Sequence, residues 1–322
     1  MDDIALELGL SKSTVSRALS DSGRISMETK NRVRECAKRH GFKPNLVAKA
    51  LAGKKTLDIA AVMPFQASAT QMMFFHECLS GIVSRAALSG YSVLVCMTES
   101  SENEILQNVL SDGKVDAVVL TQLKHNDENV ALLRRHGLPF VVIGSGAGDD
   151  IVHVDSRMKE NCAQFTELVT EKLPAASRVL FVCGSLDIEA NNNRLSGFLS
   201  GMESVKDKNV QYAVCTDPSD VADEISLKNW NLVLCSDDVV CMQVVEILNE
   251  NHLEIGRDVK IASFHDSVLL ESHVPSISAV KVDAYALGEK SSELSLNLVK
   301  GEKCESVNYV DCSFAMRAST GE

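Results

Sequence analysis

The chain has 322 residues, a length that suggests about two globular domains and excludes a small disulfide-stapled protein. Hydrophobic residues make up 45% and charged residues 24%, which excludes a disordered or fibrous main body. The net charge of −12 conceals an asymmetry, because residues 1–55 hold twelve Lys and Arg against six Asp and Glu, a charge of +6, and the remainder carries −18. The composition therefore predicts a small basic head and a large acidic body.

No stretch approaches the ~20 uninterrupted apolar residues that span a bilayer, and the start Met-Asp-Asp-Ile has no cationic segment leading into an apolar run. We therefore expect a cytoplasmic protein without a membrane partner. The ten cysteines are scattered, with no C-x-x-C pair and no histidine clustering at zinc spacing. We expect buried reduced thiols, no metal and no cofactor.

Three short helices are predicted in the basic head. The first covers residues 3–8 and ends at Gly9, the second covers residues 11–19, and the third runs from Ser26 to about His40. Their apolar residues recur at helical spacing and should form one small core: Ile4, Ala5, Leu8, Val15, Ala18, Leu19, Val33, Cys36 and Ala37. Three helices with a Gly-containing turn between the first two describe a helix-turn-helix.

The second helix carries polar residues on its outer face, namely Lys12, Ser13, Ser16 and Arg17. Such a face can enter the major groove and offer donors to base edges, while nearby cations and hydroxyls bind phosphates. The alternative is that Ser and Thr only cap helices and that Lys and Arg form a solvated surface. The local charge of +6 favours DNA binding.

These features together resemble the DNA-binding head of the lactose-repressor (LacI/GalR) family of transcription regulators. The matching segments are Asp3 to Leu19, Ile25-Ser26 with Thr29, and Gly41-Phe42-Lys43-Pro44-Asn45. The resemblance implies that Lys12 and Ser13 read bases at the start of a recognition helix. It implies further contacts to phosphates or bases from Ser11, Thr14, Ser16, Arg17 and Asn45.

Residues 45–55 form a helix-capable segment of about two turns that ends at Gly53. A helix this short is marginal in water, so it should form only when something orders it. In the family a hinge helix forms on DNA, pairs with its twin and inserts a leucine into the minor groove. The resemblance implies that Leu51 is this inserted leucine. It also implies that Ala48 is the residue whose small side chain lets the hinge helix lie deep in the minor groove. A plain interdomain linker is the alternative.

Apolar strands alternate with amphipathic helices from residue 57 onward. Two series of strands are expected, at 59–63, 91–95, 117–120 and 140–143, and then at 179–182, 232–235 and 260–264. They predict an α/β body with two doubly wound parallel sheets and a ligand at the carboxyl ends of the strands. The resemblance agrees, because the family's body is a two-lobed fold like that of periplasmic binding proteins.

The expected organisation has three parts. A helix-turn-helix head covers residues 1–44, a hinge covers 45–55, and an effector-binding and dimerisation domain covers 56–322. The lobes of that domain are expected at approximately 57–153 with 282–310, and 154–281 with 311–322.

The resemblance implies that a small effector, a sugar or sugar derivative, binds between the lobes. Arg194 matches the family's effector-binding arginine, whose planar guanidinium can donate to two ligand oxygens. Thr121 stands at a strand end facing the same cleft, and Phe74 and Phe75 match an aromatic pair that lines it. The alternatives are an arginine on the surface and an aromatic pair in the core.

Two candidate effector-binding residues depart from the family pattern. Asp237 replaces an amide, and His265 replaces a carboxylate. A carboxylate accepts two hydroxyl protons, whereas a neutral imidazole offers one donor and one acceptor. Three interpretations stay open: an effector with an unusual pattern of hydroxyls, an anionic effector such as a sugar phosphate held by Arg194 and His265, and a cleft that no longer senses an effector.

The sequence as a whole predicts a homodimeric, effector-controlled repressor that binds a near-palindromic operator in double-stranded DNA. No heptad repeat follows Ser319-Thr320, so a dimer is expected rather than a tetramer.

Two other classes remain as alternatives. A sugar-binding or transport receptor should carry a signal peptide and no basic head. A cleft enzyme would use Asp237, Asp238, His265 and Asp266 for acid-base chemistry. No Gly-rich phosphate loop, nucleophile elbow or metal spacing accompanies these residues, so no enzymatic activity is expected.

Overall fold

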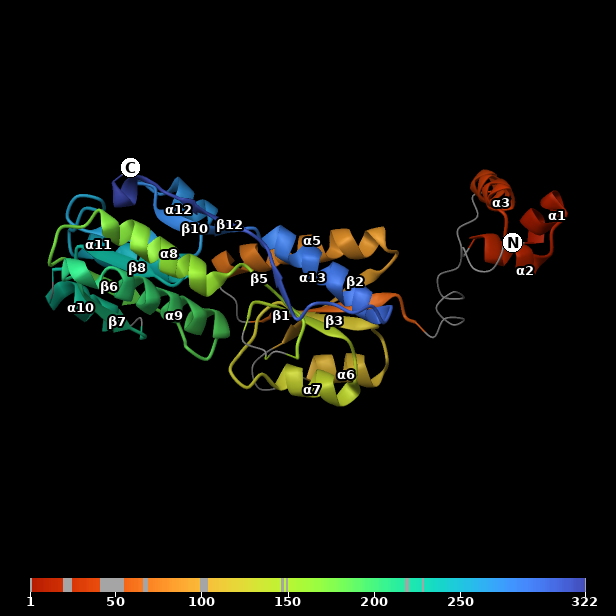
Figure 1. Ribbon diagram of the computed structural model, residues 1–322, viewed down its shortest axis with the longest axis horizontal. Helices are drawn as coiled ribbons and strands as arrows, with labels where there is room; N and C mark the ends of the chain where they lie inside the picture. The colour runs from red at the N-terminus through yellow and green to blue at the C-terminus, as the bar shows by residue number, and fades with distance from the viewer. Residues whose placement is uncertain are drawn as a thin grey trace. The chain divides into compact units, whose positions relative to one another are not determined.

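The computed structural model describes residues 2–19, 25–40, 55–65, 69–98, 104–145, 148, 150–217, 220–227 and 229–321 (Figure 1). The chain divides into two compact units, Met1–Leu57 and Asp58–Glu322. Three residues to which the resemblance gives DNA contacts, Asn45, Ala48 and Leu51, lie outside the described residues.

The first unit contains the three predicted helices, α1 (Asp2–Leu8), α2 (Lys12–Leu19) and α3 (Met27–Arg39). Gly9 separates α1 from α2 in a left-handed conformation with φ +62°, which a residue without Cβ adopts readily. Ser26 caps α3, because its Oγ accepts a hydrogen bond from the Thr29 N–H at 3.2 Å. The predicted apolar residues form one core, with Leu8 and Leu19 packed at its margin.

The second unit begins with lobe 1, whose sheet has the order β11-β5-β4-β3-β1-β2 with every pair parallel. Its strands are β1 (Asp58–Pro64), β2 (Ser92–Thr98), β3 (Ala117–Leu120), β4 (Phe140–Ile143), β5 (His153–Asp155) and β11 (Val307–Tyr309). One face packs on α5 (Ala69–Leu88) and α13 (Ala284–Val299), and the other on α6 (Glu104–Ser111) and α7 (Glu128–His136) (Figure 1). Both faces are therefore buried, as in other parallel sheets.

Lobe 2 repeats this plan with the order β12-β10-β9-β8-β6-β7. Its strands are β6 (Arg178–Val182), β7 (Gln211–Cys215), β8 (Leu232–Cys235), β9 (Lys260–Ser263), β10 (Ser278–Val282) and β12 (Cys312–Ala315). One face packs on α8 (Met158–Glu171) and α9 (Glu189–Ser204). The other packs on α10 (Val221–Leu227), α11 (Asp238–Glu250) and α12 (Val268–Ser272). Short 3-10 turns cover Lys206–Lys208 and Ala318–Thr320.

The two predicted parallel sheets are confirmed, and in lobe 2 the last strand, β12, pairs antiparallel with β10. The reason is the route of the chain, because β10 leads out of lobe 2 towards α13 of lobe 1 and β12 brings the chain back. The expected lobe boundary after residue 153 falls inside β5, which pairs with β4 and belongs to the first sheet.

Helices α5 and α13 of lobe 1 cross with their backbones in close approach. A Cβ on Gly288 would lie 1.9 Å from the Cys78 carbonyl oxygen, and a Cβ on Gly81 would lie 2.1 Å from that of Tyr285. Only glycine fits such a crossing. The crossing fixes α5, which carries Phe74 and Phe75 to the edge of the lobe.

All ten cysteines are free thiols, eight of them buried and Cys304 and Cys312 half-buried, as expected from the sequence. Within the described part of the chain, no helix is both long enough and apolar enough to cross a bilayer.

Candidate functional site

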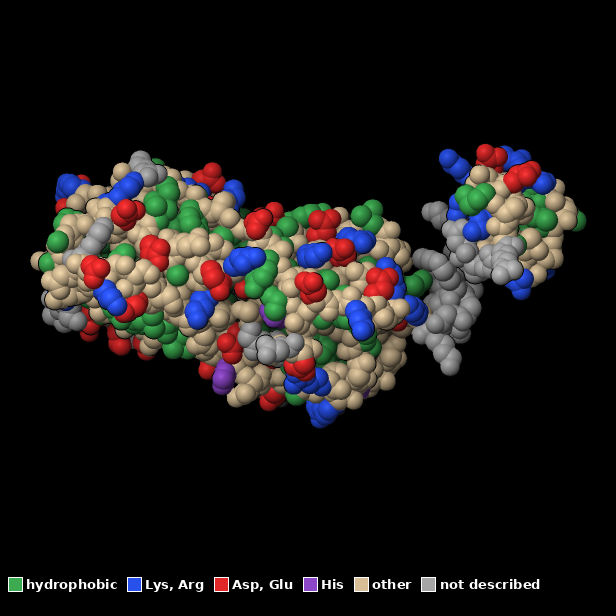
Figure 2. Space-filling model, viewed as in Figure 1, with side chains coloured by type: hydrophobic (Ala, Val, Ile, Leu, Met, Phe, Trp, Pro, Cys, Tyr) green, Lys and Arg blue, Asp and Glu red, His purple; other side chains and the backbone are tan. Residues whose placement is uncertain are grey.

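The outer face of α2 carries the side chains that the sequence assigns to DNA. Lys12, Ser13, Ser16 and Arg17 are exposed, while Val15 is buried on the opposite side. Figure 2 shows Lys and Arg side chains on the described surface of this unit. The exposed face therefore offers cations and hydroxyls together, as a recognition helix requires.

Two contacts of this face show how it is organised before DNA binds. Ser11 caps α2, because its Oγ accepts from the Thr14 N–H at 3.1 Å and lies 2.8 Å from the hydroxyls of Ser13 and Thr14. The Lys12 Nζ lies 2.8 Å from Asp2 Oδ1, and both side chains are about two-thirds exposed. Such an exposed ion pair is weak, so Lys12 can exchange Asp2 for a DNA acceptor at little cost.

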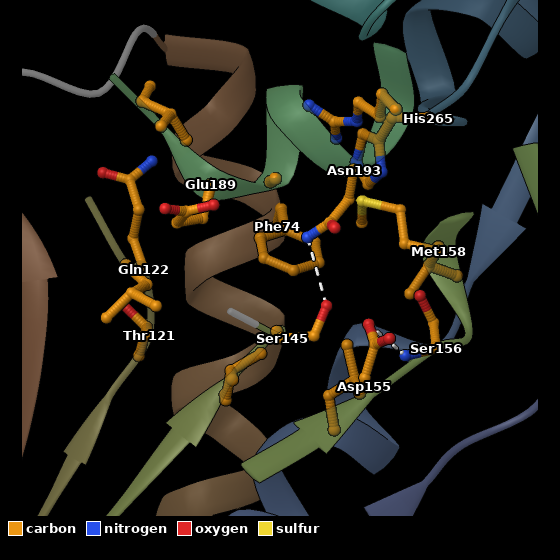
Figure 3. A pocket seen from close by; sticks show the side chains of 18 of the residues that line it. Phe74, Thr121, Gln122, Ser145, Asp155, Ser156, Met158, Glu189, Asn193 and His265 are labelled. Atoms are coloured by element: carbon orange, nitrogen blue, oxygen red, sulfur yellow. Dashed lines mark hydrogen bonds between the residues drawn. The ribbon is translucent and has the colours of Figure 1, made fainter. Parts of the chain in front are cut away.

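A cavity of about 110 Å³ lies between the two lobes of the second unit (Figure 3). The structure brings all six predicted effector-binding residues to its wall: Phe74, Phe75, Thr121, Arg194, Asp237 and His265. Most of its polar residues lie at or within three residues of strand ends, with Thr121 directly after β3, and Asp237 and His265 two residues after β8 and β9. The carboxyl ends of parallel strands meet at one edge of each sheet, which places these side chains together.

Arg194 is buried in the wall of the cavity, with its side chain 12% exposed. Its Nη1 donates to Asn191 Oδ1 at 2.9 Å and lies 3.6 Å from Asp237 Oδ2. Its Nε is buried without a hydrogen-bond partner among the described residues. An unpaired buried donor is costly, so Arg194 has one N–H group to offer to a ligand oxygen.

Asp237 is primarily the N-cap of α11, because its Oδ1 accepts from the Val240 N–H at 3.0 Å. Its Oδ2 accepts from the Ser236 hydroxyl at 3.3 Å and faces Arg194. The neighbouring Asp238 is also buried, and its Oδ2 has no hydrogen-bond partner within the described residues. Asp238 is thus the better placed of the two carboxylates to accept a hydrogen bond from a ligand hydroxyl.

His265 lines the cavity and contacts Phe74 edge to face, with ring centroids 5.3 Å apart and planes at 85°. Burial lowers the pKa of His265, and the positive charge of Arg194 lowers it further, against the opposing effect of Asp238, Asp237 and Asp266. The imidazole is therefore neutral near pH 7. Asp266 does not line the cavity and instead forms a bidentate ion pair with Arg317. The Arg317 Nη1 donates to Asp266 Oδ1 at 2.6 Å, and Nη2 donates to Oδ2 at 2.8 Å.

Several wall residues were not predicted from the sequence. The Asn193 amide donates to Ser145 Oγ at 3.1 Å and so joins lobe 2 to lobe 1 (Figure 3). Asp155, at the end of β5, is buried, and burial raises its pKa against the backbone N–H groups that bind it. Glu189 also lines the cavity. Because β5 has only three residues, the sequence around Asp155 gives no strand signal that could have identified it.

The lobes are also joined by backbone at one side of the cavity. Lys124 of lobe 1 and Ile188 of lobe 2 form an antiparallel bridge. The His125 N–H donates to the Asp187 carbonyl oxygen at 2.8 Å, and the Glu189 N–H donates to the Leu123 carbonyl oxygen at 3.1 Å. Any separation of the lobes on this side must break these bonds.

The charges on the cavity wall are unequal. Among the described residues that line the cavity, four are carboxylates, namely Asp155, Glu189, Asp237 and Asp238, and one is a cation, Arg194. Even with the pKa of Asp155 raised, the wall carries more negative than positive charge, and the neutral His265 adds none.

A helix-turn-helix unit and a two-lobed body with a polar interlobe cavity define a DNA-binding transcriptional regulator. The family described as "Bacterial regulatory proteins, lacI family" matches residues 1–45, and the "Periplasmic binding protein-like domain" matches residues 176–320. The chain is 30% identical over 314 residues to the HTH-type transcriptional regulator MalR of Staphylococcus xylosus, covering 93% of this chain and 91% of that protein. It therefore belongs to the lacI family of bacterial regulatory proteins, as the sequence resemblance implied.

Other relatives and solved structures agree. Catabolite control protein A of Staphylococcus epidermidis is 24% identical over 328 residues, with 96% of this chain and 94% of that protein covered. A lac repressor dimer bound to operator and the anti-inducer ONPF gives a TM-score of 0.78 at 20% identity, covering 99% of this chain and 98% of that chain. A complex of the transcriptional regulator CelR with cellobiose gives 0.72 at 20% identity, covering 98% of each. These two structures share the fold.

Proposed function

We propose that this protein is a homodimeric repressor that binds a near-palindromic operator through α2 and changes its operator affinity when a neutral sugar binds between the lobes. The observation that carries the proposal is the interlobe cavity, in whose wall polar groups of both lobes converge. The face of α2 supports base reading by Lys12 and Ser13 with flanking contacts from Ser11, Thr14, Ser16 and Arg17. Asn45, Ala48 and Leu51 keep the DNA-binding roles that the family resemblance implies, and the protein acts in the cytoplasm, where its operator lies.

The cavity favours a neutral sugar over a sugar phosphate. Sugar hydroxyls can donate to the unpaired Asp238 Oδ2 and accept from the unpaired Arg194 Nε. A phosphate would meet four carboxylates, an arginine already bound to Asn191 and Asp237, and an uncharged His265. The apolar face of a sugar ring fits against the half-buried Phe74. The relative crystallised with cellobiose supports the same class of ligand.

A thermal-shift screen of neutral mono- and disaccharides beside their phosphate esters tests this proposal. A sugar present at about 100 times its Kd should raise the melting temperature by roughly 5–10 °C, and its phosphate ester should raise it less. A shift of the melting temperature by phosphate esters alone would contradict the proposal that the effector is a neutral sugar. No shift by any sugar would contradict effector control. The coupling between the two binding sites is reciprocal. Operator DNA should therefore change the protein's affinity for the active sugar by the same factor by which that sugar changes the protein's affinity for DNA.

We further propose that α5 and the edge strand β2 form part of the dimer interface. Both elements expose large apolar side chains, namely Met73, Val83, Leu88, Leu94 and Val95. Several exposed large apolar side chains on one edge strand and one helix of the same lobe are consistent with an interaction site. A second copy of the chain fits it best, because operator half-sites related by a two-fold axis require two heads.

The double variant Leu94→Asp with Val95→Asp should weaken dimerisation at least about 30-fold, because each interface would bury unpaired carboxylates. Sedimentation velocity over a concentration series measures the effect. Leu199→Asp, at a similarly exposed leucine on α9, is the matched control and should leave the dimer intact. A dimer of unchanged affinity in the double variant would place the interface elsewhere.

A further inference from the structure

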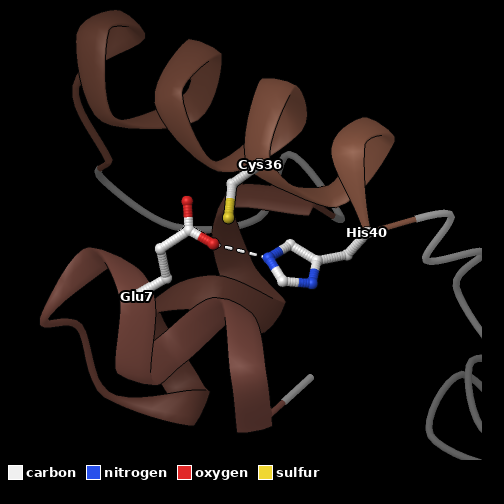
Figure 4. Close-up of side chains that lie close together, drawn as sticks. All are labelled: Glu7, Cys36 and His40. Carbon is white, nitrogen blue, oxygen red and sulfur yellow. Dashed lines mark hydrogen bonds and ion pairs between the residues drawn. The ribbon is translucent and has the colours of Figure 1, made fainter.

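Three metal-ligating side chains meet at one end of the head's core. Glu7 comes from α1, Cys36 from the last turns of α3, and His40 from the residue that ends α3 (Figure 4). Their potential ligand atoms all lie within 4.8 Å of one another. Cys36 and His40 are four residues apart, and the His40 N–H donates to the Cys36 carbonyl oxygen at 3.0 Å, so both side chains leave one closed helical turn on the same side.

The three ligand types are those that Zn²⁺ binds. Thiolate sulfur, imidazole nitrogen and carboxylate oxygen coordinate it at about 2.3, 2.0–2.1 and 2.0–2.2 Å, so atoms in a tetrahedral site lie about 3.4–3.6 Å apart. The Glu7 Oε2 and His40 Nε2 are 2.5 Å apart and must separate by about 1 Å. Both side chains are more than a third exposed and can make that movement. The fourth position would be open to water.

The carboxylate is already oriented for such a role. Arg39 Nη2 holds Glu7 Oε1 at 2.8 Å, which leaves Oε2 directed at His40. Ligating carboxylates are usually held by a second group in this way, and the second group contributes to metal affinity. Cys36 is wholly buried, and its sulfur points towards the space between the Glu7 carboxylate and the His40 ring (Figure 4).

We propose that Glu7, Cys36 and His40 form a binding site for a divalent transition-metal ion of the Zn²⁺ type. The ion replaces the hydrogen bond between Glu7 and His40 and displaces the thiol proton of Cys36, which passes to the solvent. It joins α1 to the end of α3 and so stabilises the head, because it binds only the folded arrangement. The site is separate from the interlobe cavity and does not depend on the proposed effector.

Titration of the full-length reduced protein with Co²⁺, which replaces Zn²⁺ and reports thiolate ligation by a near-ultraviolet charge-transfer band, tests the site. We expect one equivalent to produce the band, and Zn²⁺ to remove it. Cys36→Ser should abolish it, whereas Glu7→Gln and His40→Gln should each weaken Co²⁺ binding at least about tenfold. Cys304→Ser, at a half-buried thiol of the body, is the control and should leave the band unchanged.

Hydrogen exchange provides a readout that does not depend on the buried Cys36. At a Zn²⁺ concentration near the Kd of the native protein, Zn²⁺ should slow exchange in residues 2–8 and 27–40, and it should slow exchange several-fold less in Glu7→Gln, whose substitution lies on the surface. Absence of the charge-transfer band at saturating Co²⁺, or a band that survives Cys36→Ser, would overturn the proposal. Equal protection by Zn²⁺ in the native protein and Glu7→Gln would do the same. Each of these results would mean that Glu7 and His40 form only an ion pair and that Cys36 is only a core residue.

Discussion

Replacing Arg194 with alanine should give a protein that still binds its operator but no longer responds to its effector. The change removes the buried guanidinium whose Nε is available to a ligand and whose Nη1 holds Asn191 and Asp237 in place. A hydrogen bond to a charged group contributes about 1.5–3 kcal/mol, so losing the one from Nε should weaken effector binding roughly 10- to 150-fold. Calorimetric titration with the sugar found by thermal shift measures this, and fluorescence anisotropy measures operator binding.

Two further variants separate the possible causes of that loss. Arg194→Lys keeps the charge and removes the planar donor group, so it should restore only a small part of the affinity. Arg135→Ala removes an exposed arginine on α7 and should change nothing. Effector affinity in Arg194→Ala within threefold of the native protein's would show that the ligand does not use this side chain.

Replacing Lys12 with alanine should weaken operator binding and relax its sequence preference. A side-chain contact to a base edge contributes about 1–3 kcal/mol, and a homodimer carries the contact twice, so the loss should be about 30-fold or more. The affinity of the variant should be measured for an operator and for single-base variants of each half-site. This comparison distinguishes a contact of Lys12 to a base from a contact to a phosphate. Loss of a phosphate contact would weaken all sequences alike and lower the slope of the salt dependence by about one per contact.

Asp2 provides the matched control, because it binds Lys12 in the free protein. Asp2→Asn should release Lys12 and tighten operator binding by less than about fivefold, as expected for an exposed ion pair. Unchanged affinity and unchanged base preference in Lys12→Ala would remove this residue from the recognition surface.

Most of the strands that could be predicted from the sequence are buried on both faces, and the exception is the edge strand β2, whose apolar run was visible although it is partly exposed. Residues 117–120 and 232–235 are continuous apolar runs because helices cover both sides of them. The edge strand β7 was missed since it alternates and exposes Tyr212 and Val214. Strands β5 and β11 have three residues each, too few for a period to be visible.

The same physical limit applies to the sites. The six predicted cavity residues share the wall because strand ends and a family motif mark them. Asn193 and Ser145 interact only because the two lobes lie close together, and no local pattern encodes that distance. Likewise, the four-residue spacing of Cys36 and His40 gains significance only when folding brings Glu7 from another helix.

The discontinuous construction of both lobes sets the order in which this protein can fold while it is being made. Lobe 1 lacks α13 and β11 until residue 309 has been added, and α13 supplies Leu287, Leu294 and Leu296 to its core. At 5–20 residues per second, the ribosome needs roughly 8–30 s to travel from β5 to β11. The core of the head, by contrast, is complete by Ala37. A nascent chain therefore contains the complete core of the head, and the face of α2 above it, well before it contains all the residues that line the interlobe cavity.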